Sequence, residues 1–306
     1  MINTMGKKLL NTIAFLIGTF CIALSLTSCK EKGVVVSMTE CGVGVSDSTY
    51  VAPAEAPQSK VVLIEEFTGV SCPPCPNGHK VVKSIVNDKG SSVAVISIQA
   101  FGFIQAYPVI ERGDTITKHD NRTPVGTALS TNVYGKLSQT PTAGIDRMLY
   151  NGNMYMDKSL WVTQVNSRLS EAPKANVTVK SDYNSTTNTA VIKVRVAYTS
   201  SVSLPQLLTV ALTEDKVVDA QEDGLTIIED YDHEHVLRDI LTAPTGSPIL
   251  CENAVKESGR VYECTFRYDL TGKSLWNPDN CKIIAYVSNA GSGNKEVVQA
   301  AQVKLK

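Results

Sequence analysis

Two cysteines separated by two prolines are the residues of this sequence with the most evident chemistry. Cys72 and Cys75 stand in the segment EEFTGVSCPPCPNGH (65–79), directly after an apolar run. A C-x-x-C pair can exchange electrons, bind a metal or form a structural disulfide. Zinc would need two further ligands, and the sequence has no second C-x-x-C pair. A disulfide this short removes little entropy from the unfolded chain. The pattern therefore favours a redox centre, with a structural disulfide as the alternative.

The residues around this pair predict the elements that position it. The run VVLIEEF (61–67) has the length and continuous apolar character of a strand buried on both faces. The residues after the cysteines have apolar positions at helical spacing, and SVAVISIQAF (92–101) predicts a second buried strand. A strand, a helix and a strand in this order form a unit with two parallel strands. We expect Cys72 to lie exposed at the helix N-terminus, where the dipole favours a thiolate, and Cys75 to be more buried.

Residues 60–172 resemble the thioredoxin-like fold, in which a C-x-x-C pair follows the first βαβ strand. Gln139-Thr140-Pro141-Thr142 opens a further strand, where that family places a cis-proline facing the cysteines. The resemblance implies that Cys72 attacks a disulfide, that Cys75 resolves the mixed disulfide, and that Glu66 relays a proton. It also implies that Pro141 shapes the substrate groove.

The hydrophobic pattern of the sequence changes after Pro173. Segments such as TAVIKVRVAYTS and RVYECTFRYDL alternate apolar and polar residues and are separated by turn-forming residues. This pattern predicts an antiparallel β-sandwich of immunoglobulin-like type over residues 173–306. The fold class expected for the whole chain is α/β plus all-β, a thioredoxin-like domain followed by an immunoglobulin-like antiparallel β-sandwich.

The N-terminus predicts export and a lipid anchor. Two lysines precede an apolar stretch (13–26) that ends just before Cys29. This layout resembles a bacterial lipoprotein signal (1–28), with Cys29 as the lipidated residue and a tether over residues 29–59. The apolar stretch is short for an uncleaved membrane helix, which is the alternative. Removal of the signal takes away two of the 29 basic residues and none of the 30 acidic ones, which leaves a formal charge of −3 and favours no nucleic-acid partner.

The whole architecture is similar to that of the outer-membrane-protein-28-related lipoprotein family. The segments EEFTG, PTAGIDR and DHEHVLRDIL carry this likeness. It implies a location in the cell envelope, anchored by lipid to the outer membrane and facing either the periplasm or the surface.

Two functions follow from these features. The first is a membrane-tethered thiol-disulfide oxidoreductase without a cofactor, whose partners are envelope proteins with thiols or disulfides. The second is a non-catalytic surface or envelope binding protein that uses the thioredoxin-like fold as a scaffold. Fold alone does not choose between them; the intact cysteine motif favours the first.

The remaining cysteines and histidines give weaker indications. Cys251 and Cys264 flank a predicted turn, which favours a local disulfide between them, and Cys41 is then left to pair with Cys281 or to stay free. The histidines of DYDHEH (230–235) fit a solvated loop that enters a strand better than a surface metal site.

Overall fold

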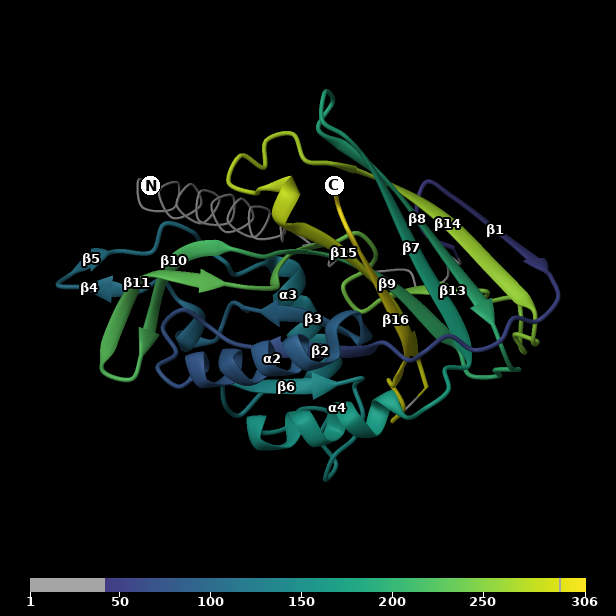
Figure 1. The fold of residues 1–306 in the computed structure, drawn as a ribbon, viewed down its shortest axis with the longest axis horizontal. Coiled ribbons are helices and arrows are strands. Elements are labelled where there is room, and N and C mark those ends of the chain that lie inside the picture. The colour runs from purple at the N-terminus through teal and green to yellow at the C-terminus, as the bar shows by residue number, and fades with distance from the viewer. Residues whose placement is uncertain (1–41, 292) are drawn as a thin grey trace, which may run out of the picture. The chain divides into compact units, whose positions relative to one another are not determined.

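A central apolar strand precedes the cysteine pair and starts the sheet that positions it. β2 (Val62–Phe67) pairs in parallel with β3 (Val93–Ile98) and antiparallel with β6 (Thr142–Ile145). Helix α2 (Cys75–Lys89) connects β2 to β3. The predicted strand–helix–strand unit is confirmed, and its chain order is visible in Figure 1.

The structure is a computed structural model that describes residues 42–291 and 293–306. The predicted signal segment (1–28), the lipidation residue Cys29 and Cys41 therefore lie outside the described residues, as does the first part of the predicted tether.

Helices cover both faces of β2 because its side chains alternate between two apolar layers. Val62 and Ile64 pack with residues of α2 and of α4 (Trp161–Leu169). Leu63 and Phe67 face the opposite way, toward the layer that contains α3 (Pro124–Leu129). Burial on both faces explains the continuous apolar run in the sequence. It also sends the adjacent residues Glu65 and Glu66 to opposite sides of the sheet.

The sheet continues well beyond the predicted first domain. Its strand order is β16-β15-β9-β12-β3-β2-β6, with β13 paired to β9. Five of these strands come from the C-terminal half: β9 (Gln206–Glu214), β12 (Val236–Ile240), β13 (Ser247–Ile249), β15 (Cys281–Asn289) and β16 (Val297–Lys304). The predicted boundary at residues 172–173 is therefore wrong as a division between separate domains. The described residues belong to one compact unit.

A second, four-stranded antiparallel sheet packs against part of the first. Its order is β1 (Ser46–Val51), β14 (Arg260–Asp269), β8 (Thr189–Tyr198) and β7 (Ala175–Asn184). The core between the sheets includes Leu208 and Val210 of β9 and Ile283 of β15. Ala211 and Ile284, their neighbours along the chain, face the layer of α3 instead. Strands β9 and β15 thus serve two cores at once (Figure 1), and the fold is a β-rich α/β architecture with one mixed and one antiparallel sheet.

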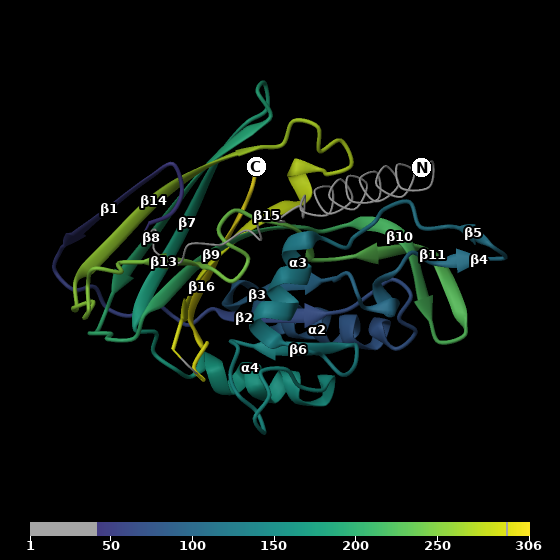
Figure 2. The ribbon, with the colours of Figure 1, turned by 180° about the vertical axis from the view of Figure 1, so that it is seen from behind.

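Two small hairpins lie at the end of the first sheet that is far from the four-stranded sheet, as both views show (Figures 1 and 2). They are β4 (Ile110–Glu111) with β5 (Asp114–Thr115), and β10 (Val217–Asp223) with β11 (Thr226–His233). Short helical turns complete the chain: Gly90–Ser92, Ile104–Ala106, Ser130–Tyr134, Lys158–Leu160 and Pro278–Asn280.

Candidate functional site

The two cysteines of the C-x-x-C segment form a disulfide at the start of α2. The Cα atoms of Cys72 and Cys75 are 5.3 Å apart, and the Cys75 N–H donates a hydrogen bond to the Cys72 carbonyl oxygen at 3.0 Å. The helix begins at Cys75, with Pro74 before it and Pro76 in its first turn. Proline fits there because the first N–H groups of a helix have no partner within the helix. The local sequence therefore turns the chain tightly enough to bring the two sulfurs together.

Both cysteines are buried in this disulfide-bonded form. Cys72 and Cys75 are each 0% exposed, so the expectation of an exposed Cys72 is wrong here. The reason lies far along the chain. The Cys72 sulfur lies 3.4 Å from Thr140 Oγ1. The Cys72 carbonyl oxygen accepts a hydrogen bond from Gln221 Nε2 at 3.3 Å. Sequence separations of 68 and 149 residues put these contacts beyond the reach of a local pattern.

Gly78 is the point at which the predicted site residues meet. The Thr140–Pro141 peptide bond is cis. A Cβ atom on Gly78 would lie 2.8 Å from Pro141 Cβ and 3.1 Å from Glu66 Oε1. Only glycine allows so close an approach at this turn of α2, one turn after Cys75. Pro141 and Glu66 therefore both lie against the helix turn that follows the disulfide.

Glu66 is a buried carboxyl group with a single close polar partner. Its residue is 1% exposed, and Oε2 accepts a hydrogen bond from Ser97 Oγ at 3.0 Å. Oε1 has no hydrogen-bond partner among the described residues. Burial raises the pKa of Glu66 to about 7, and the Ser97 hydrogen bond offsets a part of this rise. The carboxyl group can therefore gain or lose a proton near neutral pH.

Glu65, the preceding residue, is held in a different way on the other face of the sheet. Its carboxylate accepts hydrogen bonds from Arg147 Nε at 2.8 Å and Nη2 at 2.7 Å. The hydroxyl groups of Tyr134 and Tyr286 also donate to it, at 2.5 and 3.2 Å. Of the two adjacent acids, only Glu66 therefore faces α2 and the disulfide side of the sheet.

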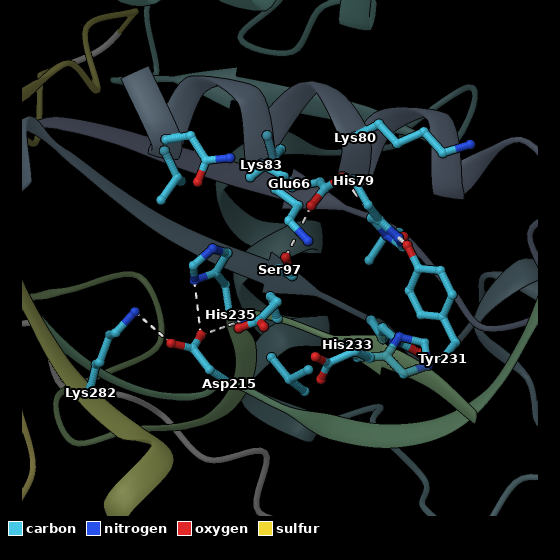
Figure 3. A pocket seen from close by; sticks show the side chains of 18 residues that line it. Glu66, His79, Lys80, Lys83, Ser97, Asp215, Tyr231, His233, His235 and Lys282 are labelled. Carbon is cyan, nitrogen blue, oxygen red and sulfur yellow. Dashed lines mark hydrogen bonds and ion pairs between the residues drawn. The ribbon is translucent and has the colours of Figure 1, made fainter. Parts of the chain in front are cut away.

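A cavity of about 440 Å³ reaches Glu66 from the surface. Its wall includes His79 of α2 and Tyr231 of β11 (Figure 3). His79 Nδ1 lies 2.8 Å from the Tyr231 hydroxyl, and Nε2 lies 2.7 Å from Thr68 Oγ1 and 4.0 Å from Glu66 Oε1. Burial lowers the pKa of His79 to about 3, with His233 and His235 as further causes. A neutral imidazole between two hydroxyl groups therefore borders the carboxyl group.

Sequence reasoning missed this role of His79 and Tyr231, although one indication was present. His79 follows Cys75 by four residues, which places both on the same face of α2. Ser97 stands opposite Glu66 in the β2–β3 register, which follows once the two strands are paired. Tyr231 comes from a hairpin whose position no local pattern predicts.

The DYDHEH segment is neither a solvated loop nor a metal centre in the part of the chain that the structure describes. His233 is 4% exposed at the end of β11, and burial lowers its pKa to about 4. His235 Nδ1 lies 3.0 Å from Asp215 Oδ1. No group of three or more His, Cys, Asp or Glu residues with metal-binding geometry occurs among the described residues. Both histidines line the cavity instead (Figure 3).

The predicted Cys251–Cys264 disulfide is wrong. Cys264 is a free thiol, 3% exposed on β14, where it faces the core between the two sheets. Cys251 is disulfide-bonded, and hence to another cysteine. Burial of Cys264 inside the sandwich keeps its thiol away from the turn that was expected to join the two. Cys281 is a second buried free thiol among the described residues.

Comparison with known proteins identifies the family of this chain. Residues 128–306 match the family model of outer membrane protein Omp28. The chain belongs to the Omp28 family. Membership in this family assigns the protein to the outer membrane or cell envelope. Among the described helices, none is both long and apolar enough to cross a bilayer.

Two solved structures extend the Omp28 comparison. HBP35 of Porphyromonas gingivalis is 16% identical, with a TM-score of 0.61, over 82% of this chain and 77% of that one. A protein of Agrobacterium tumefaciens is 12% identical, with a TM-score of 0.47, over 82% of this chain and 97% of that one. No curated protein matches the chain. At 16% identity the likeness to HBP35 concerns the fold.

Proposed function

We propose that this Omp28-family protein is a lipid-anchored thiol-disulfide exchange protein of the cell envelope, with a thioredoxin-like site and an immunoglobulin-like sandwich. The observation that carries the proposal is the convergence at one helix turn. A C-x-x-C disulfide, the cis-peptide at Pro141 and the protonatable Glu66 all lie around Gly78. Any one of these features is compatible with a structural role. Together they place a sulfur pair, which is a nucleophile when reduced, and a proton acceptor at the same turn of α2.

The exchange reaction follows from these groups. In the reduced protein, the Cys72 thiolate attacks one sulfur of a partner disulfide, and the partner's other sulfur leaves as a thiolate. Glu66, whose pKa is about 7, accepts the proton of the Cys75 thiol. The Cys75 thiolate then attacks the Cys72 sulfur and releases the second partner thiolate. The partner is thereby reduced by two electrons, and the Cys72–Cys75 disulfide forms.

The cavity supplies a path for the proton that this reaction moves. Glu66 is buried, so its proton must reach solvent through neighbouring groups or water. The cavity runs from Glu66 past His79 and Tyr231, and it also borders Lys83 (Figure 3). His79 stays neutral near pH 7 because its pKa is about 3. Its ring nitrogens can therefore hydrogen-bond to the hydroxyl groups of Thr68 and Tyr231 without placing a positive charge beside Glu66.

The test is a trap for the mixed disulfide. A Cys75→Ser variant expressed in its own envelope lacks the resolving sulfur, so partner proteins should stay bound to Cys72 until dithiothreitol releases them. The Cys72→Ser/Cys75→Ser double variant is the matched control and should show no such adducts. Absence of dithiothreitol-sensitive adducts from the single variant would contradict exchange. In the same strain, loss of incorporated labelled palmitate in Cys29→Ser tests the lipid anchor; label retained in that variant would rule it out.

A second candidate function is supported by one specific observation. Both sulfurs are fully buried, as in a disulfide that only holds a loop in place. A binding protein that uses the fold as a scaffold would keep normal partner binding in the Cys72→Ser/Cys75→Ser variant, with no adducts in Cys75→Ser. The trap therefore separates the two functions.

A further inference from the structure

The segment that carries the disulfide is fastened to a hairpin from the other half of the chain. The Glu222 N–H donates to the Val70 carbonyl oxygen at 2.8 Å, and the Gly224 N–H donates to the Pro73 carbonyl oxygen at 3.1 Å. Both donors belong to or adjoin β10, at the turn into β11. The hairpin therefore lies along the backbone on both sides of Cys72.

Gln221 is the side chain that holds this contact. It is 0% exposed. Its Nε2 donates to the carbonyl oxygens of Gly69 at 3.2 Å, Cys72 at 3.3 Å and Glu222 at 2.9 Å. The register of β10 and β11 shifts between Asp219 and Gln221, and such an irregularity re-aims a side chain. The amide thus binds the disulfide segment and the hairpin at the same point.

Apart from these hydrogen bonds, few apolar contacts join the hairpin to the rest of the described molecule. Among the described strands, β10 and β11 pair only with each other. The nearby apolar cluster has only three buried members, Val70, Val109 and Ala220. The tip is open to solvent, since Leu225 is fully exposed. Segments with few buried apolar contacts open locally at a small part of the global unfolding free energy.

The base of the hairpin is fixed more firmly than its tip. The buried Asp219 carboxylate accepts the N–H groups of Lys118 at 2.8 Å and His119 at 2.7 Å. On the other strand, the Tyr231 hydroxyl meets His79 of α2. A movement about these points would lift residues 221–226 from the disulfide segment and leave the base in place.

From these contacts we infer that the β10–β11 hairpin is a gate over the Cys72–Cys75 disulfide, with Gln221 as its latch. The inference rests on the proposed exchange function. With the gate closed, no thiolate reaches either sulfur, because exchange requires direct approach to a disulfide sulfur and both cysteines are 0% exposed. With the gate open, Cys72 becomes accessible. Gln221 is thus a positioning residue that sets the rate of exchange.

The test measures reduction of this one disulfide in the full, oxidised protein by dithiothreitol. A dithiothreitol thiolate attacks the Cys72 sulfur, Cys75 leaves as a thiolate, and the second dithiothreitol thiol releases Cys72 while dithiothreitol is oxidised. Quenched samples are alkylated and the Cys72–Cys75 peptide is followed by mass spectrometry, which separates it from the disulfide of Cys251. Gln221→Glu keeps the side-chain shape but replaces the donating amide with acceptor oxygens. We expect reduction about tenfold faster than in the wild type.

Two controls separate a gate from a merely structural role. Leu225→Ser changes the exposed tip and should leave the reduction rate unchanged. A gate alters access in both directions, so the Gln221→Glu equilibrium with glutathione should match the wild type although its rate differs. If Gln221 only stabilised the structure, Gln221→Glu would change both the equilibrium with glutathione and the rate of reduction. An unchanged rate in folded Gln221→Glu, or a shifted equilibrium that accounts for the whole rate change, would overturn the gate.

A measurement on the wild type covers the case in which Gln221→Glu does not fold. The amide hydrogens of Glu222 and Gly224 should exchange with solvent much sooner than those of β9, which lies between two cores. Equal protection of these two sets would overturn the gate. None of these measurements uses a protein partner, so the gate can fail while the trap with Cys75→Ser still succeeds, and the reverse also holds.

Discussion

The two faces of β2 treat adjacent glutamates in opposite ways. On the α3 side, Glu65 is bound by Arg147 and by two tyrosine hydroxyl groups. On the α2 side, Glu66 has one hydrogen bond, from Ser97, and an oxygen without a partner among the described residues. The first carboxylate is fully satisfied and holds layers together. The second is left protonatable at the edge of a cavity, against the turn of α2 that follows the disulfide.

The difference shows that two adjacent residues can have different roles, Glu65 in the stability of the fold and Glu66 in proton transfer. Removal of one partner from a buried, paired charge is strongly destabilising, whereas burial of an acid with few partners raises its pKa toward neutral pH. The Glu65 side also draws on β15 through Tyr286. The face that stabilises the fold is thus built from both halves of the chain.

Removal of Arg147 should have the largest effect. Arg147→Met leaves Glu65 as a buried carboxylate without its cation, so the free energy of unfolding should fall by about 3–5 kcal/mol, measured by urea denaturation. Lys118→Met is the control, because the Lys118–Asp230 pair is exposed on both sides and should contribute about 0–1 kcal/mol. An equal decrease in the free energy of unfolding of the two variants would contradict a structural role for the Arg147–Glu65 pair.

The pH dependence of stability should report Glu66. Its pKa is about 7 in the folded protein against an ordinary value of 4.5, so the folded state binds more protons between these pH values. The contribution of Glu66 to the free energy of unfolding should therefore fall by about 3 kcal/mol as pH rises from 4.5 to 7. Burial lowers the pKa values of His79 and His233, and their contributions change in the opposite direction, so the quantity to measure is the difference between the wild type and Glu66→Gln. Glu66→Gln should lack this component and be more stable than the wild type above neutral pH. Parallel curves for the two proteins in urea titrations would show that Glu66 does not titrate in this range.

The addition of a side chain at Gly78 should have the smallest effect on stability of the three changes considered. Gly78→Ala puts a methyl group 2.8 Å from Pro141 Cβ, and overpacking of this kind costs about 1–3 kcal/mol. Ser84→Ala, at an exposed position of the same helix, should change stability by about 0.5 kcal/mol or less. Thermal unfolding compares the two. If Gly78→Ala is as stable as Ser84→Ala, the helix turn is not as closely packed against Pro141 as described.

Local patterns in the sequence predicted the elements around the disulfide well. The apolar runs before and after the cysteines are β2 and β3. The Asn151-Gly152 pair is typical of a tight turn, and both residues have positive φ angles. The Asp157 side chain caps the helical turn before α4. Each of these features depends on residues within about one turn or one strand, which is why the sequence specifies them.

The arrangement of the C-terminal strands could not be predicted in the same way. LLTVAL of β9 and IIAYV of β15 are buried along most of their length, and a run without alternation indicates burial on both faces. That pattern was present, but it does not say which layers cover the strand. Pairing between β12 and β3 joins distant segments. The contact of Gln221 with the disulfide segment has the same non-local origin.

The shared strands also have a consequence for biosynthesis. The chain is made from its N-terminus, so β2 and β3 are synthesised long before β15 and β16, which lie within residues 281–306. Until these strands have been made, the apolar layer of β2 on the α3 side lacks some of its members. Lys60, which donates to carbonyl oxygens of β16, also lacks these partners. A product of translation that stops before β15 would therefore be unable to complete either core. The layer that backs β2 on the side away from the disulfide is therefore completed only after β15 and β16 have been made.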